Sequence, residues 1–169
     1  GDSRVAEIMR DTVVVIDPMQ NPDGRDRFIH QFTTAEGLVP DSDRLSAEHD
    51  EPWPGGRTNH YLFDMNRDWF IQTQPETIGR AAAMLEFYPV AYIDAHEMGS
   101  DGTYFFAPEA IPYNPHLAED QRVSLQLFGR TNARWFDEFG IDYFTREVYD
   151  AFYPGYGASW PSYFGSIAM

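Results

Sequence analysis

The chain has 169 residues, of which 43% are hydrophobic and 16% aromatic, a composition that predicts one folded domain over residues 1–169 and excludes a disordered chain. Its 27 acidic and 12 basic residues, the latter all arginine, give a formal net charge of −15, and a field of that sign repels nucleic acid and anionic membrane surfaces. The lack of cysteine excludes disulfides, thiolate catalysis and cysteine-ligated zinc, and no apolar run reaches the ~20 residues of a membrane span.

The N-terminal third of the chain predicts little regular structure besides one strand. Residues 1–11 are typical of the end of a helix or of a loop entered partway, so we expect the sequence to be a piece of a longer protein. The β-branched run at 12–16 (TVVVI) predicts a strand buried on both faces, and 21–24 (NPDG) predicts a tight turn. The polar, acidic stretch 32–56 predicts a long loop, which we expect to be the least ordered part of the chain.

Two helices are predicted farther along the chain. Residues 75–88 predict a helix because Pro and Glu open the segment and Pro89 closes it, with Thr73 as a candidate cap. Its apolar residues at helical spacing are Ile78, Ala82 and Leu85. A longer helix is predicted over about 116–139, where acidic residues come early and arginines late, as the helix dipole favours. Its apolar stripe contains Leu117, Leu125, Phe128, Phe136 and Phe139.

Two more strands are predicted between and beside these helices. Residues 90–93 predict a second buried strand, which leads directly into Asp94, and 104–107 predict a third that stops at Pro108. The aromatic C-terminal part, rich in Gly and Pro, predicts an ordered loop. Strands that alternate with helices predict a layered α/β domain.

Arginine and asparagine gather in two short runs, 57–59 (RTN) and 64–67 (DMNR). A guanidinium group matches a carboxylate bidentately, so such a cluster can bind a carboxylate ligand. The alternative is that Arg57 and Arg67 pair with some of the chain's many acids, and composition alone favours that alternative.

His96 follows the strand predicted at 90–93, between Asp94 and Glu97. A histidine in this position can ligate a metal through one ring nitrogen while an acid orients the ring. The alternative is a hydrogen-bonded core histidine. The other histidines, His30, His49, His60 and His116, lie in polar segments, and no HExxH motif occurs.

Tyrosines punctuate the aromatic loop at Tyr149, Tyr153 and Tyr156. A phenol on a mobile loop can donate to a substrate oxygen or relay a proton. The alternative is that these rings fill a core or an interface.

Together these runs resemble the zinc carboxypeptidase (carboxypeptidase A-like) family. RTNHYLFDMNRDW at 57–69 resembles its R-T-N-x-x-x-x-D-x-N-R-N element, and NPDG upstream and D-x-H downstream occur in the family's order. DAHEMGSDGTYFFAP and YPGYGASWPS resemble a bacterial branch. The resemblance covers roughly 13–169 and implies an α/β fold, namely part of a mixed, mostly parallel β-sheet flanked by helices.

The resemblance implies a metal centre with one zinc ion in the full-length protein. His96 matches the family's third zinc ligand, and Asp64 matches an acid that orients the first zinc histidine from behind. The family's first two ligands come from an upstream H-x-x-E, and its general base is a Glu on a strand after the aromatic loop. This chain starts too late for the former and stops at GSIAM, where that strand begins, and Asp68 departs from the family's N-R-N.

The resemblance also implies the residues that handle a substrate. Arg57 matches the arginine that polarises the scissile carbonyl and stabilises its oxyanion. Asn66 and Arg67 match the pair that grips the terminal carboxylate of a peptide. Tyr153 matches the mobile tyrosine of the substrate pocket, because Gly157 follows it at the family's spacing, with Tyr149 and Tyr156 as alternatives.

We therefore expect the full-length protein to be soluble and to hydrolyse peptide bonds near a free C-terminal carboxylate; its compartment stays open, with a secreted or periplasmic location as one candidate. The 169-residue chain by itself is expected to lack peptidase activity and a tight zinc site, and to self-associate through uncovered sheet edges. Three alternatives stay open: a non-catalytic domain that binds carboxylates or peptides, a zinc amidase or deacylase acting on cell-wall or other amides, and a plain acidic structural domain.

Overall fold

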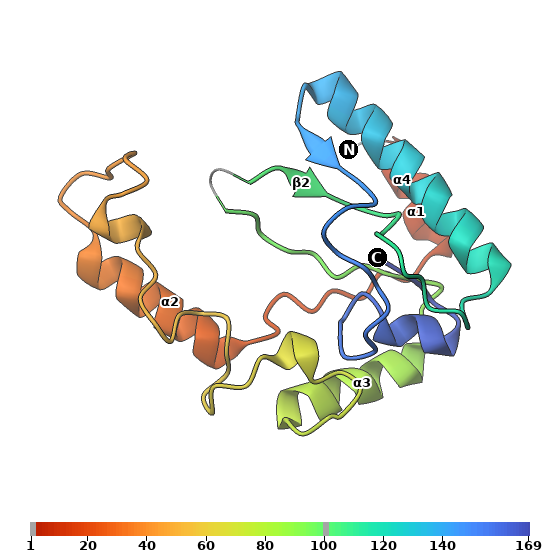
Figure 1. Ribbon diagram of the computed structural model, residues 1–169, viewed down its shortest axis with the longest axis horizontal. Coiled ribbons are helices and arrows are strands. Elements are labelled where there is room, and N and C mark those ends of the chain that lie inside the picture. Colours follow the sequence, from red (N-terminus) through yellow and green to blue (C-terminus); the bar gives the residue numbers. More distant parts are fainter. Residues whose placement is uncertain (1–2, 100–101) are drawn as a thin grey trace.

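The computed structural model of the chain describes residues 3–99 and 102–169 (Figure 1). The α-helices are α1 (Ser3–Asp11), α2 (Pro22–Ala35), α3 (Pro75–Phe87) and α4 (Glu119–Phe139). Short 3₁₀ turns lie at η1 (Ala47–His49), η2 (Met65–Arg67) and η3 (Trp160–Phe164). The strands are β1 (Ala91–Tyr92), β2 (Tyr104–Phe105), β3 (Tyr143–Phe144) and β4 (Ile167–Ala168).

The described strands form two separate parallel pairs. In the first pair Ala91 of β1 faces Ile167 of β4, and in the second β2 pairs with β3. Helices and parallel strands together confirm the predicted mixed α/β class. The described strands nevertheless form two small sheets rather than one mixed sheet, and α2 with the loop that follows it projects away from both (Figure 1).

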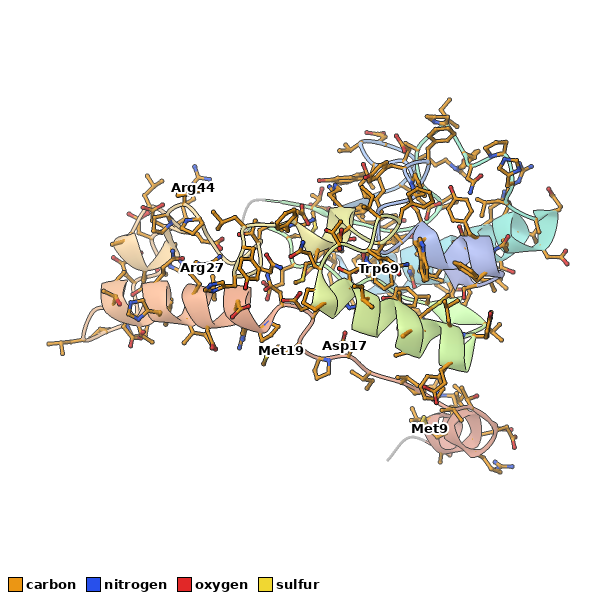
Figure 2. The ribbon with its side chains drawn as sticks, turned by 90° about the horizontal axis from the view of Figure 1, so that it is seen from below. Met9, Asp17, Met19, Arg27, Arg44 and Trp69 are labelled. Carbon is orange, nitrogen blue, oxygen red and sulfur yellow. The ribbon has the colours of Figure 1, made fainter. Side chains whose placement is uncertain are left out.

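The core lies where α3 meets β1 and η3. Trp69 is fully buried, and its ring lies 5.5 Å from that of Trp160 and 5.7 Å from that of Tyr92. Ala81 and Met84 of α3 complete this cluster. Figure 2 shows Trp69 directly above α3, so the chain segment that follows η2 is anchored on this helix.

The carboxylate of Asp68 holds the two residues that precede α3. It accepts hydrogen bonds from the backbone N–H and hydroxyl of Thr73 at 2.9 and 2.7 Å and from the N–H of Gln74 at 2.9 Å. Burial of the carboxyl group opposes its ionisation, but these hydrogen bonds outweigh burial and hold the pKa of Asp68 below its ordinary value. Thr73 therefore does not cap the helix as predicted, since Gln74 is the N-cap residue and Thr73 donates to Asp68.

The predicted inner faces of the helices are only partly right. The helix at 75–88 is confirmed, but its buried residues are Thr77, Ala81 and Met84, and Ile78 of the predicted stripe is exposed. The small side chain of Ala81 packs in the cluster with the bulky Trp69 and Trp160, which the hydrophobic pattern alone does not show. The helix predicted at 116–139 is also confirmed as α4, with Leu125 buried.

The N-terminal predictions fail at two places. The segment 12–16 is not a strand, and Val13 and Ile16 are 82% and 76% exposed. A strand needs a pairing partner, and no described strand pairs with this segment. The NPDG run is the start of α2 instead of a tight turn, because Asn21 accepts from the N–H of Gly24 at 3.0 Å and caps the helix. Residues 32–35 consequently belong to α2, and the predicted loop starts at 36.

The other two strands are confirmed at smaller extent. Residues 90–93 contain β1, but Val90 and Ile93 are exposed rather than buried, because β1 has a neighbour on one side only among the described residues. Residues 104–107 contain β2, and Ala107 beyond it is buried. No helix in the described ranges is both long and apolar enough to cross a membrane.

Candidate functional site

Asn66 is the centre of a hydrogen-bonded cluster at the end of β1. Its backbone N–H donates to Asp64, the N-cap of η2, at 2.9 Å. Its side-chain oxygen accepts from the N–H of Gly157 at 2.6 Å, so the amide nitrogen must face the other way. That nitrogen lies 2.9 Å from Asp94 Oδ2 and 2.9 Å from His96 Nε2. The side chain of Asn66, 28 residues before Asp94 in the sequence, thereby contacts both the carboxylate and the imidazole.

Asp94 fixes the orientation of the His96 ring. The carboxylate oxygen Oδ2 lies 3.0 Å from Nε2, and the Asp94 side chain is 7% exposed whereas that of His96 is 36% exposed. A hydrogen bond to a carboxylate is roughly twice as strong as a neutral one, which favours the tautomer with the proton on Nε2. The Asn66 amide and the His96 ring N–H then both donate to Asp94 Oδ2, and the 2.9 Å between the two nitrogens is a contact rather than a hydrogen bond. Nδ1 then carries the ring's free lone pair, and it has no partner among the described residues.

The ionisation of Asp94 follows from the same contacts. Burial of the carboxyl group raises its pKa, but the hydrogen bond and charge of His96, the amide of Asn66 and the positive charge of Arg57 together hold the pKa of Asp94 below its ordinary value. The Asp94 carboxylate is therefore charged and able to orient an imidazole.

The donor set fits one metal ligand but not a complete metal centre. His96 offers Nδ1 with a carboxylate behind the ring, the usual arrangement of a ligating histidine. Within 3–99 and 102–169, however, no group of three or more His, Cys, Asp or Glu side chains is placed to hold a metal ion. Zinc centres take three or four protein ligands, so His96 and its neighbours can form only part of one.

Arg57 is paired with Asp64, the N-cap residue of η2. Its Nε donates to Asp64 Oδ2 at 3.2 Å, and both side chains are partly exposed. Arg57 is thus paired with an acid, as the alternative to a ligand-binding role predicted. An exposed ion pair contributes about 0–1 kcal/mol, so a ligand carrying a negative charge can compete for this guanidinium.

Arg27 of α2 holds the loop that carries Arg57, a role that the sequence analysis missed. Its Nη1 donates to Gly55 O at 2.6 Å and to Thr58 O at 3.2 Å, and its Nη2 donates to Asn59 O at 3.1 Å. Asn21 adds a bond from its amide to Arg57 O at 3.2 Å. Figure 2 shows Arg27 on the side of α2 that faces the following loop. The sequence gives one signal for this contact, Asn21 of the NPDG run. A capping role for this residue can be predicted from the sequence, but its contact with the loop at Arg57 cannot.

Arg67 lies against the aromatic loop. Its Nη1 donates to Asn66 O at 2.8 Å, and the guanidinium carbon lies 4.3 Å from the centre of the Tyr156 ring. Tyr153 donates its hydroxyl to Arg67 O at 3.3 Å and packs edge-on against Tyr156. Tyr149 instead stacks on Phe105 at 4.7 Å, away from this cluster. The structure therefore places two of the three candidate tyrosines, Tyr153 and Tyr156, beside Arg67.

Gly157 is required by the closeness of the loop to the site. A Cβ at this position would lie 2.6 Å from Asp94 Oδ2 and 3.0 Å from Trp69 Nε1, closer than side chains normally approach. Every residue proposed for the site takes part in one continuous network of contacts, through Asp64, through Asn66 or through the backbone of Arg67. Those residues are Arg57, Asp64, Asn66, Arg67, Tyr153 and His96.

Comparisons of the chain with protein-family models, with curated proteins and with solved structures gave no match.

Proposed function

We propose that this chain is the substrate-binding part of a zinc carboxypeptidase-like metallohydrolase, which in its full length hydrolyses peptide bonds next to a free C-terminal carboxylate. One observation carries the proposal. Asn66 and His96 both contact Asp94 Oδ2, so a carboxylate-oriented imidazole is held beside the turn η2, whose cap Asp64 binds Arg57 and whose last residue is Arg67. A metal ligand and two carboxylate-binding groups are the parts that such a reaction needs together.

The metal chemistry would enter through His96. Its Nδ1 would supply one ligand, with Asp94 keeping the proton on the opposite ring nitrogen. Zinc, where bound, lowers the pKa of a coordinated water to about 7 and polarises a carbonyl oxygen. Asp64, already the cap of η2, would keep its carboxylate near the remaining ligands that a longer chain supplies.

The substrate end would be held by Arg67 and Asn66. A guanidinium group has five N–H donors, and among the described contacts the Arg67 side chain uses one of them, to Asn66 O. The Tyr156 ring supports one face of the guanidinium and leaves its edge for a bidentate carboxylate. Tyr153 lies close enough to cover a terminus bound there.

Arg57 would act on the reacting carbonyl. Its exposed ion pair with Asp64 can open at small cost and release N–H donors toward a developing oxyanion. Loss of one such donor typically lowers kcat by about 10²- to 10³-fold. The general base would have to come from outside the described residues.

The substitution Arg67→Ala, made in a longer form of the protein that includes an upstream H-x-x-E, tests the substrate clamp. Hydrogen bonds to a charged group contribute ~1.5–3 kcal/mol, so KM for peptides with a free C-terminus should rise about 10- to 150-fold. Arg130→Ala, which removes an exposed arginine of α4, is the matched control and should leave KM unchanged. An unchanged KM for Arg67→Ala would remove the carboxylate clamp from the proposal.

The incomplete ligand set favours a second candidate, a domain that binds peptide carboxylates without hydrolysing them. Calorimetric titration of the 169-residue chain separates the two readings. The hydrolase proposal expects no stoichiometric sub-micromolar zinc binding by this chain and restoration of such binding in the longer form. The binding-domain reading expects peptide affinity that a chelator does not change. Amidated peptides should bind poorly in either case, whereas a zinc amidase or deacylase would accept them.

A further inference from the structure

A hollow of about 120 Å³ lies between α4 and the segment that follows β2. A second, smaller hollow of about 10 Å³ shares four of its lining residues. Those shared residues are Glu109, Tyr113, Leu117 and Leu125. We call the larger hollow the Glu109 cavity, after the only carboxylate in either lining.

The backbone around Glu109 is held on both sides. Pro108 O accepts from the N–H of Arg146 at 2.9 Å, and the N–H of Ala110 donates to Tyr149 O at 2.8 Å. On the opposite side α4 packs directly on the chain, because a Cβ at Gly129 would lie 2.1 Å from Ala107 O. The backbone of this segment is therefore held between the helix and the aromatic loop.

Glu109 has no cationic partner among the described residues. Arg122 also lines the Glu109 cavity, but its Nη2 pairs with Glu119 Oε2 at 3.2 Å. Burial raises the pKa of Glu109 above its ordinary value, because the carboxyl group loses water and gains only its own backbone N–H in return. A carboxylate that lacks a cationic partner is a strong hydrogen-bond acceptor for a cation that enters the cavity.

We propose that the Glu109 cavity binds an organic cation, an ammonium or guanidinium group on a short apolar stem, with the charge on Glu109 and the stem against Leu117 and Leu125. The volume suits such a stem, since a cavity of about 150 Å³ holds benzene. A hard metal ion would need several oxygen ligands, and this lining supplies one carboxylate. The inference needs neither zinc nor any residue of the proposed hydrolase site.

The test is to titrate the chain separately with n-butylammonium, n-butanol and n-butyrate and to monitor binding by NMR chemical shifts. Butylammonium should bind more tightly than its two isosteres, and Glu109→Gln should weaken it by about 10- to 100-fold. Glu138→Gln removes an exposed acid of α4 that is not in the cavity lining, matches the charge change and should bind like the wild type. Equal binding of butylammonium and butanol, tighter binding of butyrate on Arg122, or equal losses in the two variants would overturn the proposal.

Two further measurements sharpen the result. Nα-acetyl-lysine amide, compared with its norleucine counterpart, separates the two sources of the cation: a preference for lysine assigns the cavity to a peptide side chain, and its absence assigns it to free amines. The Tm of Glu109→Gln at pH 7 should equal or exceed that of the wild type, because the variant removes an unpaired buried charge. A lower Tm would mean that the carboxylate serves an intramolecular contact, and the site would be withdrawn.

Discussion

Replacing Gly157 with alanine tests whether the aromatic loop rests on the Asn66–Asp94–His96 cluster. The new Cβ would lie 2.6 Å from Asp94 Oδ2 and 3.0 Å from Trp69 Nε1. Neither neighbour can move easily, because Asp94 is hydrogen-bonded to Asn66 and His96 and Trp69 is fully buried. The loop must therefore lift, and the bond from Gly157 N–H to Asn66 Oδ1 is lost with it.

The expected cost can be worked from these contacts. Overpacking of a fixed site costs about 1–3 kcal/mol, and the lost hydrogen bond about 0.5–1.5 kcal/mol. For a domain of this size each kcal/mol corresponds to ~2–4 °C in Tm, so Gly157→Ala should lower Tm by roughly 5–15 °C. Without the Gly157 N–H the Asn66 amide is free to rotate, and the His96 ring should also become more mobile.

Gly79→Ala provides a control of opposite sign. Gly79 lies inside α3, and nothing comes within 4 Å of an added Cβ there. Alanine in place of an unconstrained helical glycine stabilises by about 0.5–1 kcal/mol. Thermal unfolding followed by circular dichroism, with the His96 ring signals in NMR spectra, measures both variants. If both Gly157→Ala and Gly79→Ala have a higher Tm than the wild type, the loop does not touch the cluster and the site as described is wrong.

Two other substitutions test the elements that position the site. Asp68→Asn should lower the free energy of unfolding by about 1–3 kcal/mol at pH 7, because an amide accepts fewer of the bonds from Thr73 and Gln74. A lowered folded-state pKa gives stability that is present above the ordinary value of 3.8 and lost below it, so urea unfolding should show the difference vanishing as the pH falls toward 2. Arg27→Lys should accelerate hydrogen exchange at 55–59, because a compact ammonium cannot span the carbonyls that the two terminal nitrogens of the guanidinium reach, while Arg25→Lys should not.

The sequence predicts elements where one local signal is strong. The helix α4 follows from its charge order and length, and α3 from the Pro-Glu start and the closing Pro89. The site runs also predict that Asn66, Arg67 and His96 share a site, and in the structure Asn66 contacts both others, Arg67 through its backbone carbonyl and His96 at its side-chain amide.

Other features depend on partners that local patterns do not contain. The run at 12–16 has the composition of a buried strand, yet nothing among the described residues pairs with it, so its valines are exposed. On the inner face of α3, Ala81 and Met84 pack in one cluster with Trp69 and Trp160. A hydrophobic pattern records which residues are apolar, whereas packing decides which of them face the core.

The D-x-H spacing shows how a short pattern can still determine site geometry. In an extended chain, residues two apart share a face, so Tyr92, Asp94 and His96 point the same way. Tyr92 packs on Trp69, which fixes that face toward the chain segment after η2. The bond from Asp94 N–H to Met169 O at 2.8 Å continues the β1–β4 pairing and sets its register. A slip of one residue would turn both Asp94 and His96 away from Asn66, so this two-residue strand pair determines whether the site exists.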